Sequence, residues 1–425
     1  MVSLTEDKII SLIRREVVPA IGCTEPVAVA ICVAKATEVL GDIPEQVTLL
    51  LSGNIIKNAM GVGIPGTGMV GLPIAIALGA IAGKSEYGLE VLKDVDEAAI
   101  EKGKKFIEEE RIKILHHKNP PCNLHIDVTV SKGKDIAQAV ISGSHTNFIH
   151  ISRNGKIVYE GEGLNESHEN EDDLKLSAST VYDFAMNVPL EKIGFILESG
   201  WMNRDAARLA LREDYGHGLG KVIKDEGIKF FGDTTIRHLL AMTSAACDAR
   251  MGGAQIPVMS NSGSGNQGIT ATLPVVCFAE DIDATDEQLT RALALSNLTS
   301  IYIKQGLGRL SALCGCVVAS TGASAGLVHL MGGGYEEVCS AIKNMVANLT
   351  GMICDGAKPA CALKITSGVS TALMSAMLAM NGKCVTSREG IVNDDIDKTV
   401  YNLTSIGKEA MTETDNLVLD IMINK

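Results

Sequence analysis

The segment LHIDVTV, residues 124–130, alternates apolar and polar side chains. Successive side chains of a β-strand point to opposite faces of the sheet, so this period of two predicts a half-buried strand. Two more strands are predicted at residues 147–152 and 156–160, and Asn154-Gly155 between them is a pair typical of a tight hairpin turn. The segment therefore predicts an antiparallel sheet inside a small α/β unit that spans residues 85–189.

Outside this unit the sequence favours helices. A helix is predicted directly after Pro26, because proline suits the first helical turn. Residues 47–52 form the one short apolar run that predicts a buried strand instead. The expected fold class is α+β, with a mainly helical catalytic domain made of residues 1–84 and 190–425 and the α/β unit inserted as a second domain. The acidic stretch Gly161–Asp173 predicts an exposed loop.

The composition excludes nucleic acid as a partner and indicates the compartment of the protein. The 425 residues carry a formal net charge of −13, so the chain lacks the basic surplus that neutralises a nucleic-acid backbone. The first residues include acids and no long apolar run, which is unlike a secretory signal. Eleven scattered cysteines suit a reducing compartment. We therefore expect a cytoplasmic protein that binds no nucleic acid, while assembly into a homo-oligomer stays open.

Three uncharged stretches were compared with membrane-spanning helices. One is too short, and the other two are rich in Ser, Thr, Gly and Cys, whereas a spanning helix is a run of about 20 mostly apolar residues. Buried helices with close packing of small residues are the better interpretation, so no membrane association is expected. The stretches are Met69–Ala82, Leu310–Tyr335 and Ile365–Gly382.

Six of the cysteines fall between residues 314 and 384, and two of them flank a loop. Cys354 and Cys361 enclose Asp-Gly-Ala-Lys-Pro-Ala, in which glycine and proline predict a turn. A charged loop between two thiols is unlike a close-packed core. Clustered thiolates suit zinc or an iron–sulfur cluster, and the spacing alone does not name the metal.

Cys23 lies directly before a predicted helix. The unpaired N–H groups and the dipole at a helix N-terminus favour a thiolate, which would make Cys23 a base or a nucleophile. The alternative is a buried thiol beside a helix cap.

Small polar side chains surround several glycines in three further segments. In the run Ser260–Gly268, glycines let the backbone approach a ligand, and successive N–H groups can form a site for a carboxylate. The alternative for this run is a flexible turn, and the alternative for His145 is a structural histidine. The predicted substrate-binding residues are Ser52, Asn54, His145, Asn147, Ser262, Gly263, Ser264, Asn266 and Gln267.

Four motifs in a fixed order resemble one known family. They are IGCTEP at residues 21–26, ARMGG at 249–253, SNSGSGNQG at 260–268 and CDGAKPACALK at 354–364. Together they are similar to the L-cysteine desulfidase family, which is related to the alpha subunit of iron–sulfur L-serine dehydratases. The similarity covers nearly the whole chain, and the four motifs in this order are more specific than any one of them.

The resemblance implies a [4Fe-4S] cluster held by three cysteines, with one iron left open. The ligands carried over are Cys314, Cys354 and Cys361, and Cys316 is an alternative to Cys314. The resemblance also implies that Cys23 is the catalytic thiol. Two departures from the serine dehydratases favour the desulfidase branch: the last two ligand cysteines are closer together, and residues 420–425 contain no cysteine that could cap the open iron.

The expected reaction is the β-elimination of L-cysteine to pyruvate, ammonia and hydrogen sulfide. The open iron would bind the substrate thiolate as a Lewis acid, and Cys23 would remove the α-proton. The sequence shows no signature for pyridoxal phosphate. Two alternatives stay open: an L-serine dehydratase acting at the same site, and a non-catalytic thiol or metal redox sensor. A sensor would need exposed cysteines, which the glycine-rich, apolar surroundings disfavour.

Overall fold

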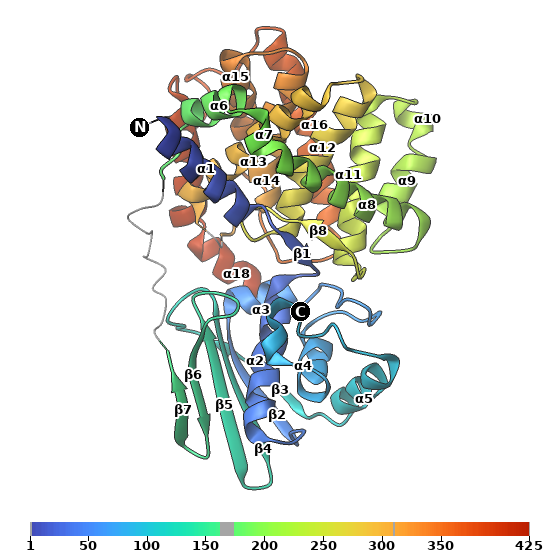
Figure 1. Cartoon of the computed structure of the whole chain (residues 1–425), viewed down its shortest axis with the longest axis vertical. Coiled ribbons are helices and arrows are strands. Elements are labelled where there is room, and N and C mark those ends of the chain that lie inside the picture. Colours follow the sequence, from blue (N-terminus) through green and yellow to red (C-terminus); the bar gives the residue numbers. More distant parts are fainter. Residues whose placement is uncertain (1, 162–173, 309–310, 425) are drawn as a thin grey trace.

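The computed structural model describes residues 2–161, 174–308 and 311–424, and it divides visually into two lobes (Figure 1). One lobe, here called the sheet lobe, contains the elements from α2 to β7. The other, the helical lobe, contains α1, β1 and the elements from α6 onward. The predicted loop at Gly161–Asp173 lies, apart from its first residue, outside the described residues.

The sheet lobe is a six-stranded sheet with helices packed on it. The strand order is β3-β2-β4-β5-β6-β7. Apolar side chains of α2 and of the inner strands share one buried core, and α4 and α5 pack beyond α2 (Figure 1). The elements are α2 (Thr24–Leu40), β2 (Gln46–Ser52), α3 (Gly53–Ala59), α4 (Leu72–Ile81), η1 (Ser85–Glu90), α5 (Glu97–Glu108), β3 (Ile112–His117), β4 (His125–Lys132), β5 (Asp135–Ser142), β6 (Phe148–Arg153) and β7 (Lys156–Glu160).

The sheet has the half-buried strand that the alternation predicted, and it also contains one parallel pair of strands. Ile126, Val128 and Val130 of β4 are buried, and β4 to β7 pair in antiparallel order. The turn between β6 and β7 has positive φ at both Asn154 and Gly155, as a tight hairpin requires. The pairing of β2 with β3 is parallel, so the sheet is mixed. Parallel strands need a long crossover, which here is supplied by α3, α4 and α5.

The helical lobe contains long helices that are buried along most of their length. Their elements are α1 (Val2–Glu16), β1 (Pro19–Ile21), α6 (Ala178–Asn187), α7 (Leu190–Ile193), η2 (Gly194–Ile196), α8 (Leu197–Arg212), α9 (Leu219–Asp225), α10 (Ile228–Phe231), α11 (Thr235–Met251), β8 (Pro257–Met259), α12 (Gly265–Asp281), α13 (Asp286–Leu307), α14 (Gly315–Leu330), α15 (Tyr335–Leu349), α16 (Cys361–Met380), α17 (Ile396–Ser405), η3 (Ile406–Ala410) and α18 (Thr412–Ile423). The expected α+β class, with mostly helical content, is confirmed.

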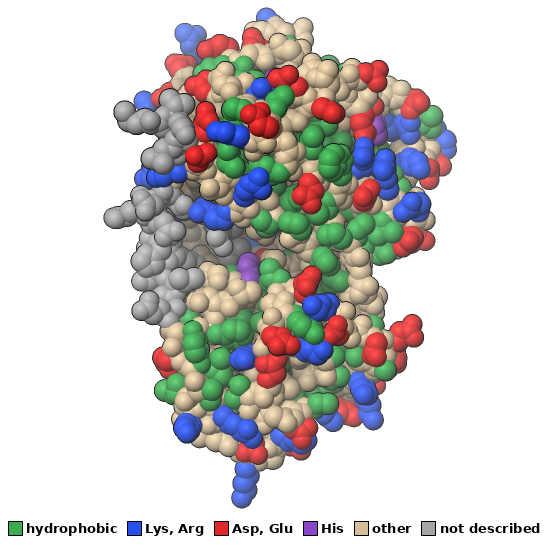
Figure 2. Space-filling view, viewed as in Figure 1, with side chains coloured by type: hydrophobic (Ala, Val, Ile, Leu, Met, Phe, Trp, Pro, Cys, Tyr) green, Lys and Arg blue, Asp and Glu red, His purple; other side chains and the backbone are tan. Residues whose placement is uncertain are grey.

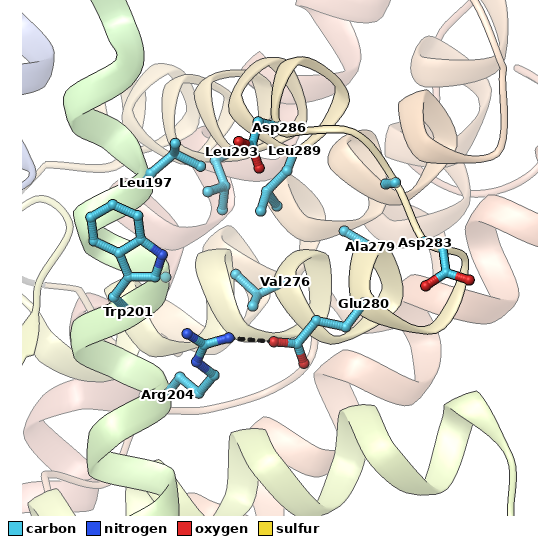
Figure 3. A pocket seen from close by; sticks show the side chains of 12 residues that line it. Leu197, Trp201, Arg204, Val276, Ala279, Glu280, Asp283, Asp286, Leu289 and Leu293 are labelled. Carbon is cyan, nitrogen blue, oxygen red and sulfur yellow. Dashed lines mark hydrogen bonds and ion pairs between the residues drawn. The ribbon is translucent and has the colours of Figure 1, made fainter.

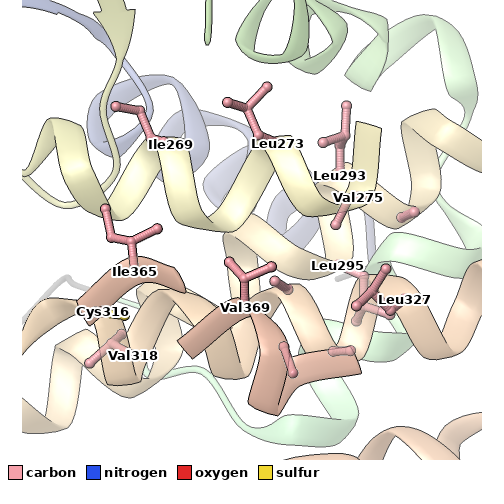
Figure 4. Close-up of a cluster of buried hydrophobic side chains, with 14 of the residues drawn as sticks. Ile269, Leu273, Val275, Leu293, Leu295, Cys316, Val318, Leu327, Ile365 and Val369 are labelled. Atoms are coloured by element: carbon pink, nitrogen blue, oxygen red, sulfur yellow. The ribbon is translucent and has the colours of Figure 1, made fainter. Parts of the chain in front are cut away.

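The core of the helical lobe lies between α12, α13, α14 and α16 (Figure 4). Small residues let these helices approach closely, as expected from their Ser, Thr and Gly content. Among the described residues, α16 alone is long and apolar enough to cross a membrane by length and composition, and half of that stretch is buried inside the protein. α16 therefore has the dimensions of a spanning helix and the packing of a core helix.

The division of the chain into domains stays a prediction. The packing places α2, β2, α3 and α4 against the sheet of the predicted insert, although they precede the predicted boundary at residue 84. The strand β1 pairs with β8 of the helical lobe, so the chain enters the sheet lobe just before Cys23. Both the catalytic candidate and the glycine-rich loop after β8 therefore lie where the lobes meet.

A buried ion pair joins the lobes. Lys57 of α3 is 2% exposed, and its Nζ pairs with a carboxylate oxygen of Asp415 on α18. Removing one partner of a buried pair leaves an uncompensated charge, which typically costs about 3–5 kcal/mol. We expect Asp415→Asn to lower the free energy of unfolding by about 3 kcal/mol in denaturant titrations. Asp420→Asn on the exposed side of the same helix is the control, and equal stability of both variants would contradict the role of the pair.

Candidate active site

Cys314 and Cys354 are held side by side by a short antiparallel bridge. Leu313 pairs with Ile353, the backbone N–H of Cys314 donates to Met352 O at 2.9 Å, and the N–H of Cys354 donates to Ala312 O at 2.6 Å. Cys314 is also the N-cap residue of α14. Two predicted cluster ligands that are 40 positions apart in sequence are therefore fixed on adjacent backbone segments.

Cys361 is the first residue of α16 and the third of the predicted cluster ligands. Its N–H donates to Lys358 O at 2.8 Å, so the loop from Cys354 folds back on itself. Lys358 and Lys364 both form ion pairs with the Asp355 carboxylate. Burial opposes ionisation of Asp355, yet the two ammonium groups hold the pKa of its carboxyl at about 2. The loop is therefore closed by charge pairing, with its two cysteines at the ends.

The three thiols are electrostatic neighbours. Burial, together with the Cys354 thiol and more weakly Cys361, raises the pKa of Cys314 to about 12, while Lys364 opposes the rise. Burial and Cys354 also raise the pKa of Cys361, which Lys358 and Lys364 lower. Thiolates crowded together repel one another, so bringing them together demands positive charge nearby. Two lysines and the N-termini of α14 and α16 provide it.

Cys316 lies in the packed interface between two helices, unlike Cys314. Its Sγ donates to Lys364 O at 3.1 Å, and it packs against Gly368 in the interface between α14 and α16. Figure 4 includes Cys316 among the side chains of the buried hydrophobic cluster. This position suits a core thiol, and it favours Cys314 as the ligand of the pair.

Cys23 lies directly before α2, as the sequence predicted, and the structure makes it the N-cap residue of that helix, but its thiol is not acidified. It is 4% exposed, and its Sγ donates to Glu25 Oε2 at 3.0 Å. Burial and then the Glu25 carboxylate raise the pKa of Cys23 well above its usual range, and Arg250 opposes them only in part. The prediction that the helix N-terminus lowers the pKa of Cys23 is therefore wrong, because burial and the neighbouring carboxylate raise it.

The surroundings of Cys23 are linked through α3 to residues 354–361, here called the cysteine loop. Cys23 Sγ is 3.9 Å from Asn58 O, and Gly356 in the cysteine loop lies directly on the carbonyl of Lys57. A β-carbon at position 356 would be 2.0 Å from that oxygen, and φ there is +87°, so only glycine fits. The catalytic candidate and the predicted ligands are therefore brought to one region of the fold.

The Ser260–Gly268 run forms the start of α12 beside this region. Ser264 is its N-cap and accepts from the N–H of Gln267, while Ser262 donates to Asn261. Gly263 has a φ of +80°. Asn266 Oδ1 accepts from Arg250 Nη1 at 3.1 Å and from Cys247 Sγ at 3.7 Å.

Gln267 lies beside the residue that follows a predicted ligand. Its side chain packs against Gly315, directly after Cys314: a β-carbon on that glycine would be 3.0 Å from Gln267 Cδ. Gln267 is 3% exposed, and its Oε1 has no hydrogen-bond partner. A buried amide oxygen without a partner is costly, so this atom suits a ligand that donates a hydrogen bond.

The other predicted substrate-binding residues lie at the end of the sheet. Ser52 Oγ donates to Asn123 O at 2.8 Å and accepts from the N–H of His125, so it has a structural role. Asn147 Nδ2 donates to Ser142 O at 3.0 Å in the β5–β6 turn, where His145 also lies. Asn54 Oδ1 is buried without a partner. The binding role of these four residues stays a prediction.

Two residues near the thiols were not singled out as candidates from the sequence. Arg250, 4% exposed at the end of α11, opposes the rise in the pKa of both Cys23 and Cys247. Glu25 holds the Cys23 proton. The signals that could have found them are a charged residue inside the apolar pattern of α11 and a carboxylate two positions after the candidate thiol.

A surface pocket lies elsewhere, between α8, α12 and α13 (Figure 3). Trp201 and Arg204 of α8 face Glu280 of α12 across it, and none of the predicted site residues lines it. Figure 2 shows that the surface is also hollowed along the boundary between the two lobes. The residues around Cys23 lie at that boundary.

The comparisons with known proteins establish the family. The model of the serine dehydratase alpha chain family matches residues 86–420. A UPF0597 protein of Bacteroides thetaiotaomicron is 58% identical over 426 residues, covering 100% of this chain and 99% of its own. A UPF0597 protein of Porphyromonas gingivalis is 53% identical over 428 residues, with 99% of each chain covered. The chain belongs to the serine dehydratase alpha chain family, which confirms the relationship indicated by the four motifs.

Proposed function

We propose that this chain is an iron–sulfur-dependent lyase that eliminates hydrogen sulfide from L-cysteine, giving pyruvate and ammonia. The observation that carries the proposal is the bridge between Leu313 and Ile353, because it sets Cys314 and Cys354 beside each other with Cys361 at the next helix start. All three are free of disulfides. Membership of a serine dehydratase family supports β-elimination from a small amino acid.

The donor set fits a [4Fe-4S] cluster. Soft thiolates are the usual ligands of such clusters, and Lys358, Lys364 and two helix N-termini supply the positive charge that thiolates need. When bound, a cluster with one open iron would supply a Lewis acid for the departing sulfur.

The chain's own residues would manage the α-proton. In the proposed mechanism, the Cys23 sulfur removes the α-proton of the substrate while its own thiol proton passes to Glu25 Oε2, 3.0 Å away. The guanidinium of Arg250 would stabilise the negative charge shared by Cys23 and Glu25. The Cα–H electron pair then forms the Cα–Cβ double bond as the Cβ–S bond breaks, and Glu25 can return its proton to the leaving sulfide. Gln267 and Asn266 would orient the substrate.

A second candidate is dehydration of L-serine at the same site. The family description favours it, since it names serine dehydratase. The same base would remove the α-proton, and hydroxide would leave instead of sulfide. A redox sensor is the weaker alternative, because Cys23 and Cys314 are 4% and 8% exposed and sensor thiols are accessible.

The deciding experiment measures sulfide, pyruvate and iron on one anaerobic sample. We expect brown protein with about four irons per chain, which releases sulfide and pyruvate in equal amounts from L-cysteine. Turnover of L-serine is measured beside it. Faster pyruvate formation from serine would favour the dehydratase, and a colourless, iron-free and fully active protein would reject the cluster.

A further inference from the structure

We propose that His238, Cys277 and Glu280 form a second metal site, which binds a single Zn²⁺ ion. The site lies between α11 and α12, away from the cysteine loop. One ligand atom of each residue lies within 4.8 Å of the other two, and among the described residues this is the only such group of three. A thiolate, an imidazole and a carboxylate are the ligand types that zinc prefers.

The two helices present these side chains to one another by regular spacing. Cys277 and Glu280 are three positions apart on α12, so they share a helix face, and His238 approaches them from α11. Cys277 is fully buried, whereas the His238 and Glu280 side chains are 34% and 36% exposed. The thiol therefore forms the inner end of the site, and the other two ligands face the side from which an ion enters.

The neighbours of the ligands orient them for a metal. His238 Nδ1 is 2.8 Å from Asp281 Oδ1, which leaves Nε2 directed toward Glu280 Oε2 at 3.9 Å. A carboxylate behind a ligand histidine is the usual arrangement at zinc sites, since it fixes the ring and its tautomer. Arg204 Nη1 binds the other oxygen of Glu280 at 2.5 Å, so Oε2 remains for the ion.

The distances and charges also suit zinc. Tetrahedral zinc with bonds of about 2.0–2.3 Å places neighbouring ligand atoms about 3.3–3.8 Å apart, close to the 3.9 Å between Nε2 and Oε2. Zn²⁺ would displace the Cys277 proton, and the negative charges of the Cys277 thiolate and the Glu280 carboxylate would then equal the 2+ charge of the ion. The negative charge of Asp281 is balanced by the positive charge of Arg204. The His238 and Glu280 side chains are 34% and 36% exposed, which gives an ion access from solvent.

The test is a zinc titration of the full chain against a chromophoric chelator, with Co²⁺ difference spectra as a second readout. We expect one Zn²⁺ per chain and a thiolate-to-cobalt absorption band. Glu280→Gln and His238→Gln should weaken zinc binding at least 10-fold, Asp281→Asn should weaken it about 10–100-fold, and Cys277→Ser should remove the cobalt band.

Cys354→Ala is the control, because zinc bound by the cysteine loop would be lost in that variant and zinc at the proposed site would not. Unchanged zinc affinity in Glu280→Gln, or a cobalt band that disappears with Cys354 and not with Cys277, would overturn the proposal. Cys277 is fully buried, so its variant can fail to fold; the half-exposed Glu280 and His238 variants then decide the question.

Discussion

Cys23→Ala is expected to abolish sulfide release while the protein keeps its iron. In the proposed mechanism this thiol removes the α-proton, and loss of a general base typically costs about 10²–10⁴-fold in rate. The side chain is not among the predicted cluster ligands, so iron content and the visible spectrum should equal those of the parent. Single-turnover assays with L-cysteine measure the first effect, and iron analysis of the same sample measures the second.

Cys32→Ala is the matched control for this experiment. Cys32 is a buried thiol on the same helix α2, and its Sγ donates to Ala139 O at 3.2 Å in the sheet lobe. A general effect of removing a thiol from α2 would appear in both variants. Normal turnover in Cys23→Ala would remove this residue from the mechanism, and loss of iron would mean that it holds the cluster.

Glu25→Gln tests whether the carboxylate accepts the Cys23 proton. In the parent, Glu25 Oε2 is 3.0 Å from the sulfur and can accept the thiol proton in the step in which the α-proton is removed. With glutamine the proton must leave to solvent, so activity should be low near neutral pH and should rise as the pH increases. A variant whose pH profile matches that of the parent would show that Glu25 is not the acceptor.

Cys354→Ala is expected to lose the cluster and the activity together. Cys354 is half-buried at the end of the charged loop, and its backbone bridge to Ala312 does not depend on the side chain, so the local fold should survive. Removal of one of three thiolate ligands should release the iron, which absorption at visible wavelengths and iron analysis would record. Circular dichroism should match the parent.

Two other cysteines serve as comparisons for this variant. Cys339 is buried in α15, away from the loop, so Cys339→Ala should keep both iron and activity. Cys316→Ala should keep iron at some cost in stability, because this thiol packs between α14 and α16. Iron retained in Cys354→Ala would show that Cys354 is an ordinary core thiol. Iron lost in Cys316→Ala would show that Cys316, and not Cys314, is the cluster ligand.

Local patterns in the sequence were sufficient for several elements of the fold. Alternation identified β4, the Asn154-Gly155 pair identified the β6–β7 hairpin, and Pro26 indicated the first turn of α2. The parallel pairing of β2 with β3 could not be predicted in this way, because the partner strand follows a crossover of three helices. Long-range pairing is decided by how the helices pack on the sheet.

Local sequence patterns also do not reveal the tertiary contacts of the candidate site. Residue types and motifs indicated the thiols, but the pKa of Cys23 depends on burial and on the distance to Glu25, neither of which spacing reveals. The same holds for Gln267, because its burial against Gly315 and its unpaired Oε1 depend on how α12 packs beside the start of α14. Which polar residues converge is a property of tertiary packing.

The position of Lys57 has a consequence for biogenesis. Its carbonyl lies against Gly356, while its ammonium group is neutralised by Asp415, 358 residues later in the chain. Because Asp415 is 358 positions after Lys57, this ion pair can form only once α18 has been synthesised, so the contact between the lobes at α3 is completed late in translation.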